Sequence, residues 1–283
     1  MDKYGLLMVA LAETAVGFVQ HEPDPAPREW IEAVHDPAYV AAVFDGTLPR
    51  EAERRIGFPV VQTMVARSQR VIGGTYLAAR LALSEGFAAN TAGGSHHALP
   101  NTGAGYCIFN DIAVAAVRLL AEGAVGRIAV VDLDVHQGDG TAAIFAGHED
   151  VATFSIHAAK NFPVRKQSST RDVELPDGTA DAEYLAILAN ELPRFLDGAR
   201  ADVVIYQAGV DPHVDDRLGR LALSDDGLVA RERLVAQTCI ERGLPLASTL
   251  GGGYGADRMA VALRHARSII ALGGCYTKTS LPS

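Results

Sequence analysis

Segments with the composition of buried strands alternate with segments of helical spacing along most of this 283-residue chain. We expect strands at residues 87–91, 128–132, 151–156, 202–207 and 246–249, and helices at residues 60–83, 111–121, 140–146, 182–196, 225–242 and 256–272. Repeated strand–helix–strand units give a parallel sheet with helices on both faces. Because no linker or internal repeat divides the chain, the sequence predicts a single α/β domain over residues 1–283, with a central, mostly parallel sheet.

The composition excludes several classes of partner. With 25 basic and 34 acidic residues the formal charge is −9, and no cluster of Lys and Arg follows the spacing of a phosphate backbone, so direct nucleic-acid binding is not expected. An acidic surface suits cationic substrates such as lysine-bearing peptides or polyamines. No apolar segment approaches the roughly 20 residues that cross a bilayer, so we expect no membrane span and a soluble, cytoplasmic protein. The three cysteines, Cys107, Cys239 and Cys275, form no C-x-x-C, which indicates a reducing compartment without a disulfide framework or a thiolate zinc site.

The two ends of the chain carry their own expectations. Residues 6–12 are apolar, but Asp2 before them and Glu13 after them fit an amphipathic helix better than a signal peptide. Residues 30–44 have helical spacing that is interrupted at Pro37. The last residues, 274–283, are expected to form a loose tail.

An unusual set of polar residues follows the predicted strand 128–132. In an extended chain alternate side chains share a face, so Asp132, Asp134 and His136 would project to the same side of the strand end. Two or more carboxylates with an imidazole suit a divalent metal such as zinc or iron. Taken alone, this run is equally compatible with solvated Asp residues that cap the next helix.

Three further strand ends carry unusual residues: Gly93-Gly94-Ser95-His96-His97-Ala98, Ala208-Gly209-Val210-Asp211 and Gly251-Gly252-Gly253-Tyr254-Gly255. Ligands bind at this edge of open α/β sheets, so we expect these segments to converge on one crevice. The glycine runs lack both the G-x-G-x-x-G and the G-K-[ST] pattern, which argues against nucleotide binding. A neutral imidazole at His96 or His97 would serve as a base, and Asp132 and Asp139 are the carboxylates that would orient the two rings.

The motifs occur in an order that resembles a known family. The segments concerned are Gly93-Gly94-Ser95-His96-His97-Ala98, Gly105-Tyr106-Cys107-Ile108-Phe109-Asn110-Asp111, the run 132–141, Ala208-Gly209-Val210-Asp211 and Gly251-Gly252-Gly253-Tyr254. Together they resemble the zinc-dependent histone deacetylase superfamily, which has the arginase/deacetylase fold, over about residues 73–270. Residues 71–75, 183–185 and 216–221 look most similar to the class IV branch and its bacterial relatives.

The resemblance implies a catalytic apparatus, residue by residue. Asp134, His136 and Asp211 would hold Zn²⁺, with Fe²⁺ as the alternative metal. His97 would match the general base and acid and His96 its electrostatic partner, with Asp139 and Asp132 behind them. Tyr254 would match the tyrosine that donates a hydrogen bond to the developing oxyanion.

The resemblance also implies a structural cation, a substrate tunnel and a boundary. The ligands of a structural potassium ion would be Asp132, Asp134, Ser155 and the carbonyls of His136 and Ile156. The substrate tunnel would be lined by Gly105, Tyr106, Phe162, Leu218, Gly252 and Gly253. Residues 1–7 look like a segment that relatives place after a first strand, so we expect an N-terminal edge strand of the family to be missing.

The function that this pattern favours is a zinc-dependent amidohydrolase that removes acetyl or longer acyl groups from the ε-amine of lysine in proteins or peptides. The alternatives are an acetylpolyamine or other small-molecule amide deacetylase, a two-manganese arginase or agmatinase, and a non-catalytic acyl-lysine-binding module. The arginase alternative lacks its second spaced carboxylate pair, since Pro212-His213 follows Asp211. The presence of Tyr254 with both histidines argues against a pure binder. The oligomeric state and the physiological substrate are left open by the sequence.

Overall fold

The computed structural model describes residues 2–277 and contains a six-stranded sheet in which all paired strands are parallel. The strands are β1 (Phe87–Ala89), β2 (Ile128–Asp132), β3 (Val151–Ala158), β4 (Arg171–Leu175), β5 (Val203–Gln207) and β6 (Leu246–Thr249), in the spatial order β1-β6-β5-β2-β3-β4. The parallel sheet that the alternating pattern predicts is therefore confirmed.

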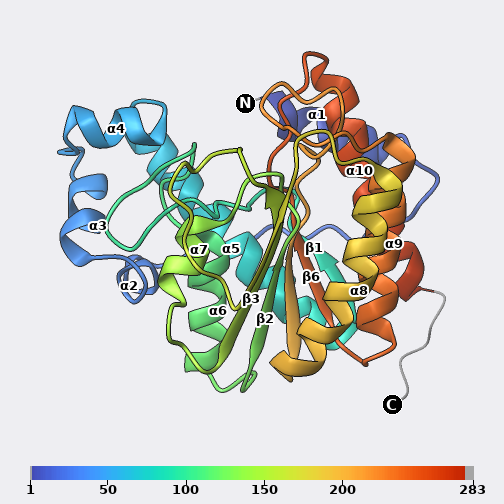
Figure 1. Cartoon of the computed structure of the whole chain (residues 1–283). Coiled ribbons are helices and arrows are strands. Elements are labelled where there is room, and N and C mark those ends of the chain that lie inside the picture. The colour runs from blue at the N-terminus through green and yellow to red at the C-terminus, as the bar shows by residue number, and fades with distance from the viewer. Residues whose placement is uncertain (1, 278–283) are drawn as a thin grey trace.

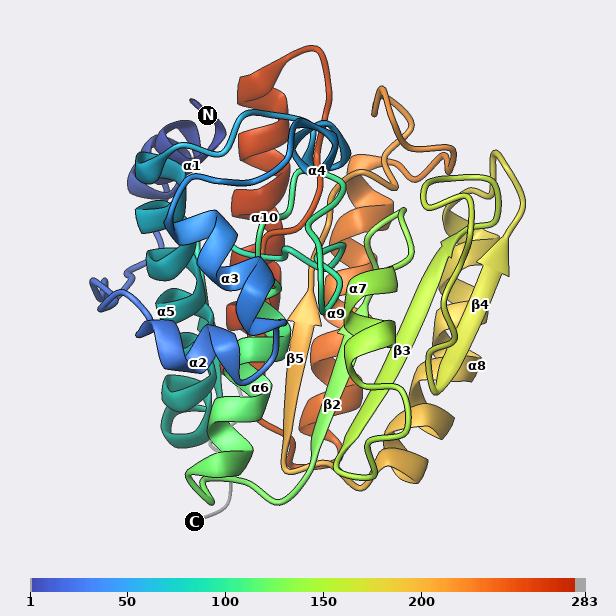
Figure 2. The ribbon, with the colours of Figure 1, turned by 90° about the vertical axis from the view of Figure 1, so that its left-hand side faces the viewer.

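Helices cover both faces of this sheet, as Figures 1 and 2 show. One face is covered by α8 (Asp181–Ala199), α9 (Asp225–Ile240) and α10 (Arg258–Tyr276), and the other by α5 (Gln62–Glu85) and α6 (Asp111–Ala121). The short α7 (Asp139–Ile144) follows β2, and α1 (Asp2–Ala12) packs against α10. A further group, α2 (Arg28–Glu32), α3 (Pro37–Phe44) and α4 (Arg50–Ile56), shares an apolar cluster with α5. The predicted single α/β fold is confirmed.

The central strands are apolar throughout because both of their faces are buried. In β2, Ala129 and Val131 face the core under α8–α10, whereas Ile128 and Val130 face the core under α5 and α6. Every residue of β2 and β5 is buried. A strand between two helical layers cannot show the apolar–polar alternation of a half-exposed strand, which is why a continuous β-branched run marks it in the sequence.

The topology places a switch point between β2 and β5. After β2 the chain continues through α7 to β3 on one side, and after β5 it continues through α9 to β6 on the other side. Two neighbouring parallel strands whose connections leave in opposite directions form a switch point, where the loops separate and a ligand can enter. The ladder between these strands ends at the pair Asp132–Gln207, so the residues that follow lie at this switch point.

Several boundaries differ from the sequence prediction. The predicted strand 87–91 ends at Ala89, and the pattern gave no sign of α4 or β4. β4 has a polar Arg-Asp-Val-Glu-Leu sequence because it is an edge strand with only Leu175 buried. The tail predicted from residue 274 is wrong in its first part, since α10 continues to Tyr276, whose buried hydroxyl donates to Leu244 O at 2.9 Å. Residues 278–283 lie outside the described part.

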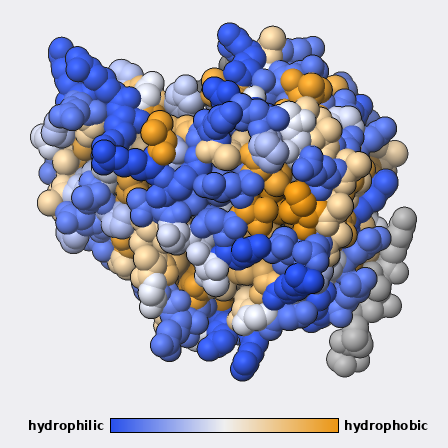
Figure 3. Space-filling model, viewed as in Figure 1, coloured by the Kyte–Doolittle hydropathy of each residue, from blue (hydrophilic) through white to orange (hydrophobic). Residues whose placement is uncertain are grey.

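The surface is hydrophilic over most of the face shown in Figure 3. This face is notched along its upper edge, between the lobe of α3 and α4 and the lobe of α1 and α10. Among residues 2–277, no helix combines the length and the apolar character of a membrane span.

Candidate metal centre

The three predicted metal ligands meet at the switch point. Asp134 and His136 follow β2, Asp211 follows β5, and all three side chains are buried. One ligand atom from each residue lies within 4.8 Å of the others. The Nδ1 atom of His136 is 3.0 Å from Asp134 Oδ1 and 3.1 Å from Asp211 Oδ2. Segments far apart in the sequence therefore place two carboxylates around one imidazole nitrogen.

Backbone amides hold both carboxylates in place. The amide of Val135 donates to Asp211 Oδ1 at 2.9 Å, and the amide of Gly252 donates to Asp134 Oδ2 at 2.7 Å. The Gly252 amide comes from the glycine run after β6, so a third loop closes over the group. Hydrogen bonds of this kind orient ligating carboxylates.

The electrostatics of this group call for a positive charge among the carboxylates. Burial and the nearby charge of Asp134 raise the pKa of Asp211 to about 7. Burial disfavours a charged His136, but its hydrogen bonds with Asp134 and Asp211 outweigh burial and raise the pKa of this imidazole to about 10. Two carboxylates and an imidazole are a donor set that suits zinc or iron, so the residues fit a divalent cation in place of the proton.

Two buried histidine–carboxylate pairs lie beside the ligand group. His96 Nδ1 donates to Asp132 Oδ2 at 2.6 Å and His97 Nδ1 donates to Asp139 Oδ1 at 2.7 Å, and the two rings are 4.1 Å apart. Because an ionised carboxylate only accepts hydrogen bonds, each Nδ1 carries the proton and each Nε2 is the atom that remains for chemistry. These are the pairs that the sequence predicted.

The two histidines differ in their charge. Burial disfavours the charged form of both rings, but the charges of Asp132 and Asp134 outweigh burial at His96 and raise its pKa to about 9. Burial and the neighbouring His96 lower the pKa of His97 to about 4. At neutral pH the metal-free site thus pairs a neutral imidazole at His97 with a cationic one at His96.

Asp111, the first residue of α6, organises the histidine loop. Its Oδ1 accepts from the amide of Ser95 at 2.6 Å, its Oδ2 accepts from the amide of Gly94 at 3.1 Å, and Thr75 also donates to it. We did not predict Asp111 as a site residue. The signal that would have found it is an acidic residue that opens an otherwise apolar, buried helix.

Tyr254 lies in the loop between β6 and α10, with its ring centroid 6.3 Å from that of His136. Burial and the charges of Asp134 and Asp211 raise the pKa of its phenol well above the usual range, so the hydroxyl keeps its proton and can donate. The amide of Tyr254 donates to Asp216 Oδ2 at 2.6 Å, which anchors this loop.

Asp216 is a second residue that the sequence analysis missed. Its Oδ1 also accepts from the amides of Leu218 and Gly219, each at 2.9 Å. It therefore connects the loop after Asp211 with the loop of Tyr254. The signal was present, because an Asp followed two or three residues later by free amides is the pattern of an Asx turn.

Three of the predicted tunnel residues lie at the surface around the site. Tyr106, Phe162 and Leu218 are 56%, 43% and 43% exposed. The edge of Phe162 contacts His97 with a centroid distance of 4.8 Å, and Asn161 Nδ2 donates to Leu218 O at 2.6 Å. The loops of Phe162 and Leu218 are therefore neighbours beside His97.

Two of the glycines that we assigned to the tunnel, Gly105 and Gly252, instead lie directly against side chains of the candidate site. Gly105 has a φ of +52°, and a Cβ there would lie 2.5 Å from His97 Cδ2, so this glycine lets the backbone lie against the ring of His97. Gly252 lies over the carboxylates of Asp134 and Asp211 rather than along a wall. Gly253 follows it in the same loop. The tunnel itself remains a prediction.

The residues proposed for a structural potassium ion lie at and after the end of β2 and within the neighbouring strand β3. Asp132 is directly opposite Ser155 in the β2–β3 ladder, Ile156 follows in β3, and the amide of Asp134 donates to Asp132 Oδ1 at 3.1 Å. The Ser155 hydroxyl is 2.9 Å from His157 Nδ1. A cation bound here remains a prediction.

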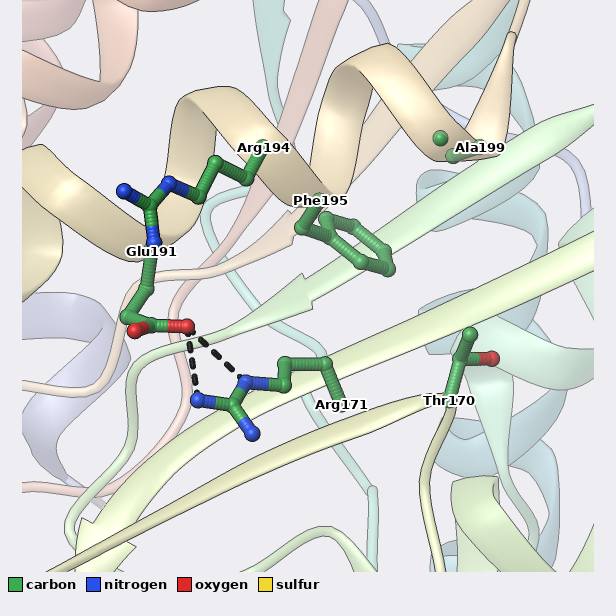
Figure 4. A pocket seen from close by; sticks show the side chains of 7 residues that line it. Thr170, Arg171, Glu191, Arg194, Phe195 and Ala199 are labelled. Atoms are coloured by element: carbon green, nitrogen blue, oxygen red, sulfur yellow. Dashed lines mark hydrogen bonds and ion pairs between the residues drawn. The ribbon is translucent and has the colours of Figure 1, made fainter.

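A hollow between the start of β4 and one face of α8 lies apart from these groups. The guanidinium of Arg171 faces the carboxylate of Glu191 there, as Figure 4 shows. Glu191 Oε2 is 2.9 Å from Arg171 Nε and 2.8 Å from Arg171 Nη2. The hollow is lined by Thr170, Arg171, Glu191, Arg194, Phe195, Gly198 and Ala199. None of the candidate site residues is among them, so this hollow does not belong to the metal centre.

The fold and the site together define an α/β protein with a buried Asp–His–Asp group of the metal-binding type at the switch point of its sheet. The profile of the histone deacetylase domain matches residues 2–270. An uncharacterized protein of Picosynechococcus sp. is 48% identical over 269 residues, which cover 94% of this chain and 89% of that protein. Histone deacetylase 2 of Arabidopsis thaliana is 32% identical over 200 residues (70% of this chain, 52% of that protein). Acetoin utilization protein AcuC of Bacillus subtilis is 31% identical over 222 residues (71% of this chain, 57% of that protein).

Solved structures show the same fold. The HDA15 HD domain aligns with a TM-score of 0.80 at 21% identity and covers 96% of this chain and 81% of its own. Acetylpolyamine aminohydrolase from Burkholderia pseudomallei aligns with a TM-score of 0.78 at 24% identity and covers 97% and 90%. The chain belongs to the histone deacetylase family, which places it among the amide hydrolases.

Proposed function

We propose that this chain is a zinc-dependent deacylase that removes acetyl or longer acyl groups from the ε-amine of lysine in proteins or peptides. The observation that carries the proposal is the meeting of the Asp–His–Asp group with two histidine–carboxylate pairs at one sheet edge. Tyr254 beside this group completes the donors that an amide hydrolase needs. The names of relatives such as histone deacetylase 2 support deacylation as the reaction class.

The chemistry divides among named side chains. Asp134, His136 and Asp211 would hold the metal, which supplies an electrophile for the substrate carbonyl and makes a water more acidic. His97, neutral at pH 7 with Nε2 unprotonated, accepts the proton of the attacking water and returns it to the departing amine. His96, which lies beside His97 and is hydrogen-bonded to Asp132, would favour the negative charge that develops on the reacting centre, and the phenol of Tyr254 donates a hydrogen bond to the carbonyl oxygen.

Basic residues in the loop of Phe162 and next to Leu218 support lysine peptides over polyamines as substrates. The loop that carries Phe162 contains Lys160, Arg165 and Lys166, with no acidic residue between positions 159 and 171, although Lys160 forms an ion pair with Asp177. Arg217, next to Leu218, is exposed, and neither it nor Arg165 forms an ion pair among residues 2–277. An acylated polyamine keeps other cationic amines near its amide, and these would be repelled here, whereas an acyl-lysine in a neutral or acidic peptide would not.

The test is an assay of the zinc-loaded protein on peptides that carry acetyl-lysine or longer acyl-lysines, with N-acetylspermidine at the same concentration. We expect turnover of at least one acyl-lysine peptide and a lower kcat/KM for acetylspermidine. The Asp134→Ala variant serves as the control, because it should lose zinc and turnover together. Absence of turnover on every peptide with zinc fully bound would contradict the proposal, and a preference for acetylspermidine would support the polyamine alternative.

A further inference from the structure

Arg231, on α9, is the largest side chain that the described part of the protein buries completely. It lies on the α8–α10 face of the sheet, and the mechanism above does not use it. Its Nη1 donates to the carbonyl of Leu133 at 3.0 Å and to the carbonyl of Gly209 at 2.8 Å. A single guanidinium nitrogen, with one hydrogen for each acceptor, therefore bridges two distant segments of the chain.

These two carbonyls belong to the loops that carry the candidate metal ligands. Leu133 directly precedes Asp134, and Gly209 lies two residues before Asp211. A shift of either carbonyl would carry the adjacent carboxylate with it, because so few bonds separate them. The two hydrogen bonds of Arg231 thus restrain the distance between the two loops.

The position of these bonds in the sheet explains why they are needed. The β2–β5 ladder ends at the pair Asp132–Gln207, and one more bond follows, from the amide of Leu133 to Gln207 O at 3.1 Å. Past that point the two strands stop pairing, since the switch point requires their loops to separate. Arg231 links the two backbones just beyond the last ladder bond.

Other elements hold Arg231 itself in place. Its Nη2 donates to Glu232, which is also completely buried. Glu232 accepts in addition from the hydroxyls of Tyr206 on β5 and Ser268 on α10, the latter at 2.9 Å. Burial opposes the charge on Arg231, but the carboxylate of Glu232 raises its pKa above the ordinary value, so the guanidinium stays charged. The donor that reaches the two loops is therefore fixed from α9, α10 and the sheet.

We propose that Arg231 is a positioning residue that sets the spacing between the loop of Asp134 and His136 and the loop of Asp211, and through this spacing the metal affinity. The inference rests on the metal site of the proposed function. His136 Nδ1 faces one carboxylate from each loop, at 3.0 and 3.1 Å. Metal–ligand distances tolerate only about 0.2 Å, so loops that drift apart bind the cation more weakly.

The test compares zinc binding in variants of the full chain. Arg231→Met removes the donors but leaves Glu232 with a buried, unpaired charge, so the main variant is the double substitution Arg231→Met, Glu232→Gln. In this variant the side-chain amide oxygen at position 232 can still accept a hydrogen bond from Tyr206 or Ser268. We expect the zinc Kd, measured by competition with a chromophoric chelator, to rise at least about tenfold while the circular dichroism spectrum is retained. The visible absorption of the Co²⁺-substituted protein should change in position or intensity, and Arg231→Lys should give an intermediate Kd.

Arg264→Met is the matched control. Arg264 is also largely buried, but its guanidinium bonds the carboxylates of Asp225 and Asp215 rather than a loop carbonyl. This variant should lose stability and keep its zinc Kd within about twofold. Such a result would show that a loss of stability alone does not weaken zinc binding.

The outcomes separate this inference from the proposed function. A folded double variant with the zinc Kd and the Co²⁺ spectrum of the original chain would overturn the role of Arg231. If the double variant does not fold, Arg231→Lys decides, and an unchanged Kd and spectrum in that variant would overturn the role equally. If the original chain binds zinc tightly but hydrolyses no acyl-lysine peptide, the proposed function fails while the role of Arg231 stands.

Discussion

The substitution Gly252→Ala probes the metal centre without removing any ligand. A Cβ at position 252 would lie 1.9 Å from Asp211 Oδ2 and 2.8 Å from Asp134 Oδ2. Contacts of a Cβ below 3.0 Å are essentially never seen, so the carboxylate of Asp211 must move by about 1 Å or more. The glycine cannot retreat freely, because its carbonyl accepts from the amide of Val210 at 2.9 Å and its own amide donates to Asp134.

This displacement is large for a metal site. Metal–oxygen distances are held within about 0.2 Å, and Asp211 is also fixed by the amide of Val135, so its free oxygen cannot rotate away and still face the cation. Changes that only disturb the orientation of ligands cost about 10- to 100-fold in metal affinity. We therefore expect Gly252→Ala to weaken zinc binding at least about 100-fold, or about 2.7 kcal/mol. The crowding should also destabilise the fold by about 1–3 kcal/mol.

The assay is a chelator competition for zinc, combined with urea unfolding of the zinc-free protein. Gly198→Ala is the matched control, because this glycine lies inside α8 with nothing within 4 Å of an added Cβ. The control should keep its zinc affinity and gain about 0.5–1 kcal/mol of stability from the helix propensity of Ala. If Gly252→Ala binds zinc as tightly as the control, the carboxylates do not occupy the positions described here or do not bind the metal.

Three further predictions concern single side chains. Tyr254→Phe should keep one zinc per chain by elemental analysis and lose about 10²–10³-fold in kcat on an acyl-lysine peptide; near-normal turnover would remove the phenol from the mechanism. His97→Ala should also keep the metal and lose about 10²–10⁴-fold, and a larger loss in His96→Ala would exchange the two roles. Burial lowers the pKa of His35 from 6.5 to about 4, although its hydrogen bond with Leu99 opposes this shift. Between these pH values His35 is therefore protonated in the unfolded chain and neutral in the folded chain. His35 should thus contribute a fall of up to about 3 kcal/mol in the free energy of unfolding of the zinc-free protein as the pH drops from 6.5 to 4, and His35→Gln should flatten this part of the urea-derived profile; parallel profiles for both proteins would contradict this contribution.

The elements that the sequence predicted well are those with a strong local signal. The helix Asp111–Ala121 and the strand Ile128–Asp132 have the predicted bounds, because a capping residue or a charged run ends each apolar pattern. The elements that it missed, α4 and β4, have weak local signals. In α4 Ile56 is the buried residue, and β4 depends on pairing with β3, so both are stabilised by contacts that appear only in the folded chain.

The sequence by itself determined which chemical groups this protein has and at which strand ends they lie, since residue type and the period of the apolar pattern are local properties. It also supplied the histidine–carboxylate partners as candidates, from residue types alone. Only the tertiary structure decided that β2 and β5 are neighbours with connections leaving in opposite directions, which brings Asp211 to Asp134 and His136. The support of the site by Arg231, Asp216 and Gly252 was likewise decided there. The physical reason is that each of these contacts joins segments far apart in the chain, so its geometry depends on strand order and helix packing and not on any local propensity.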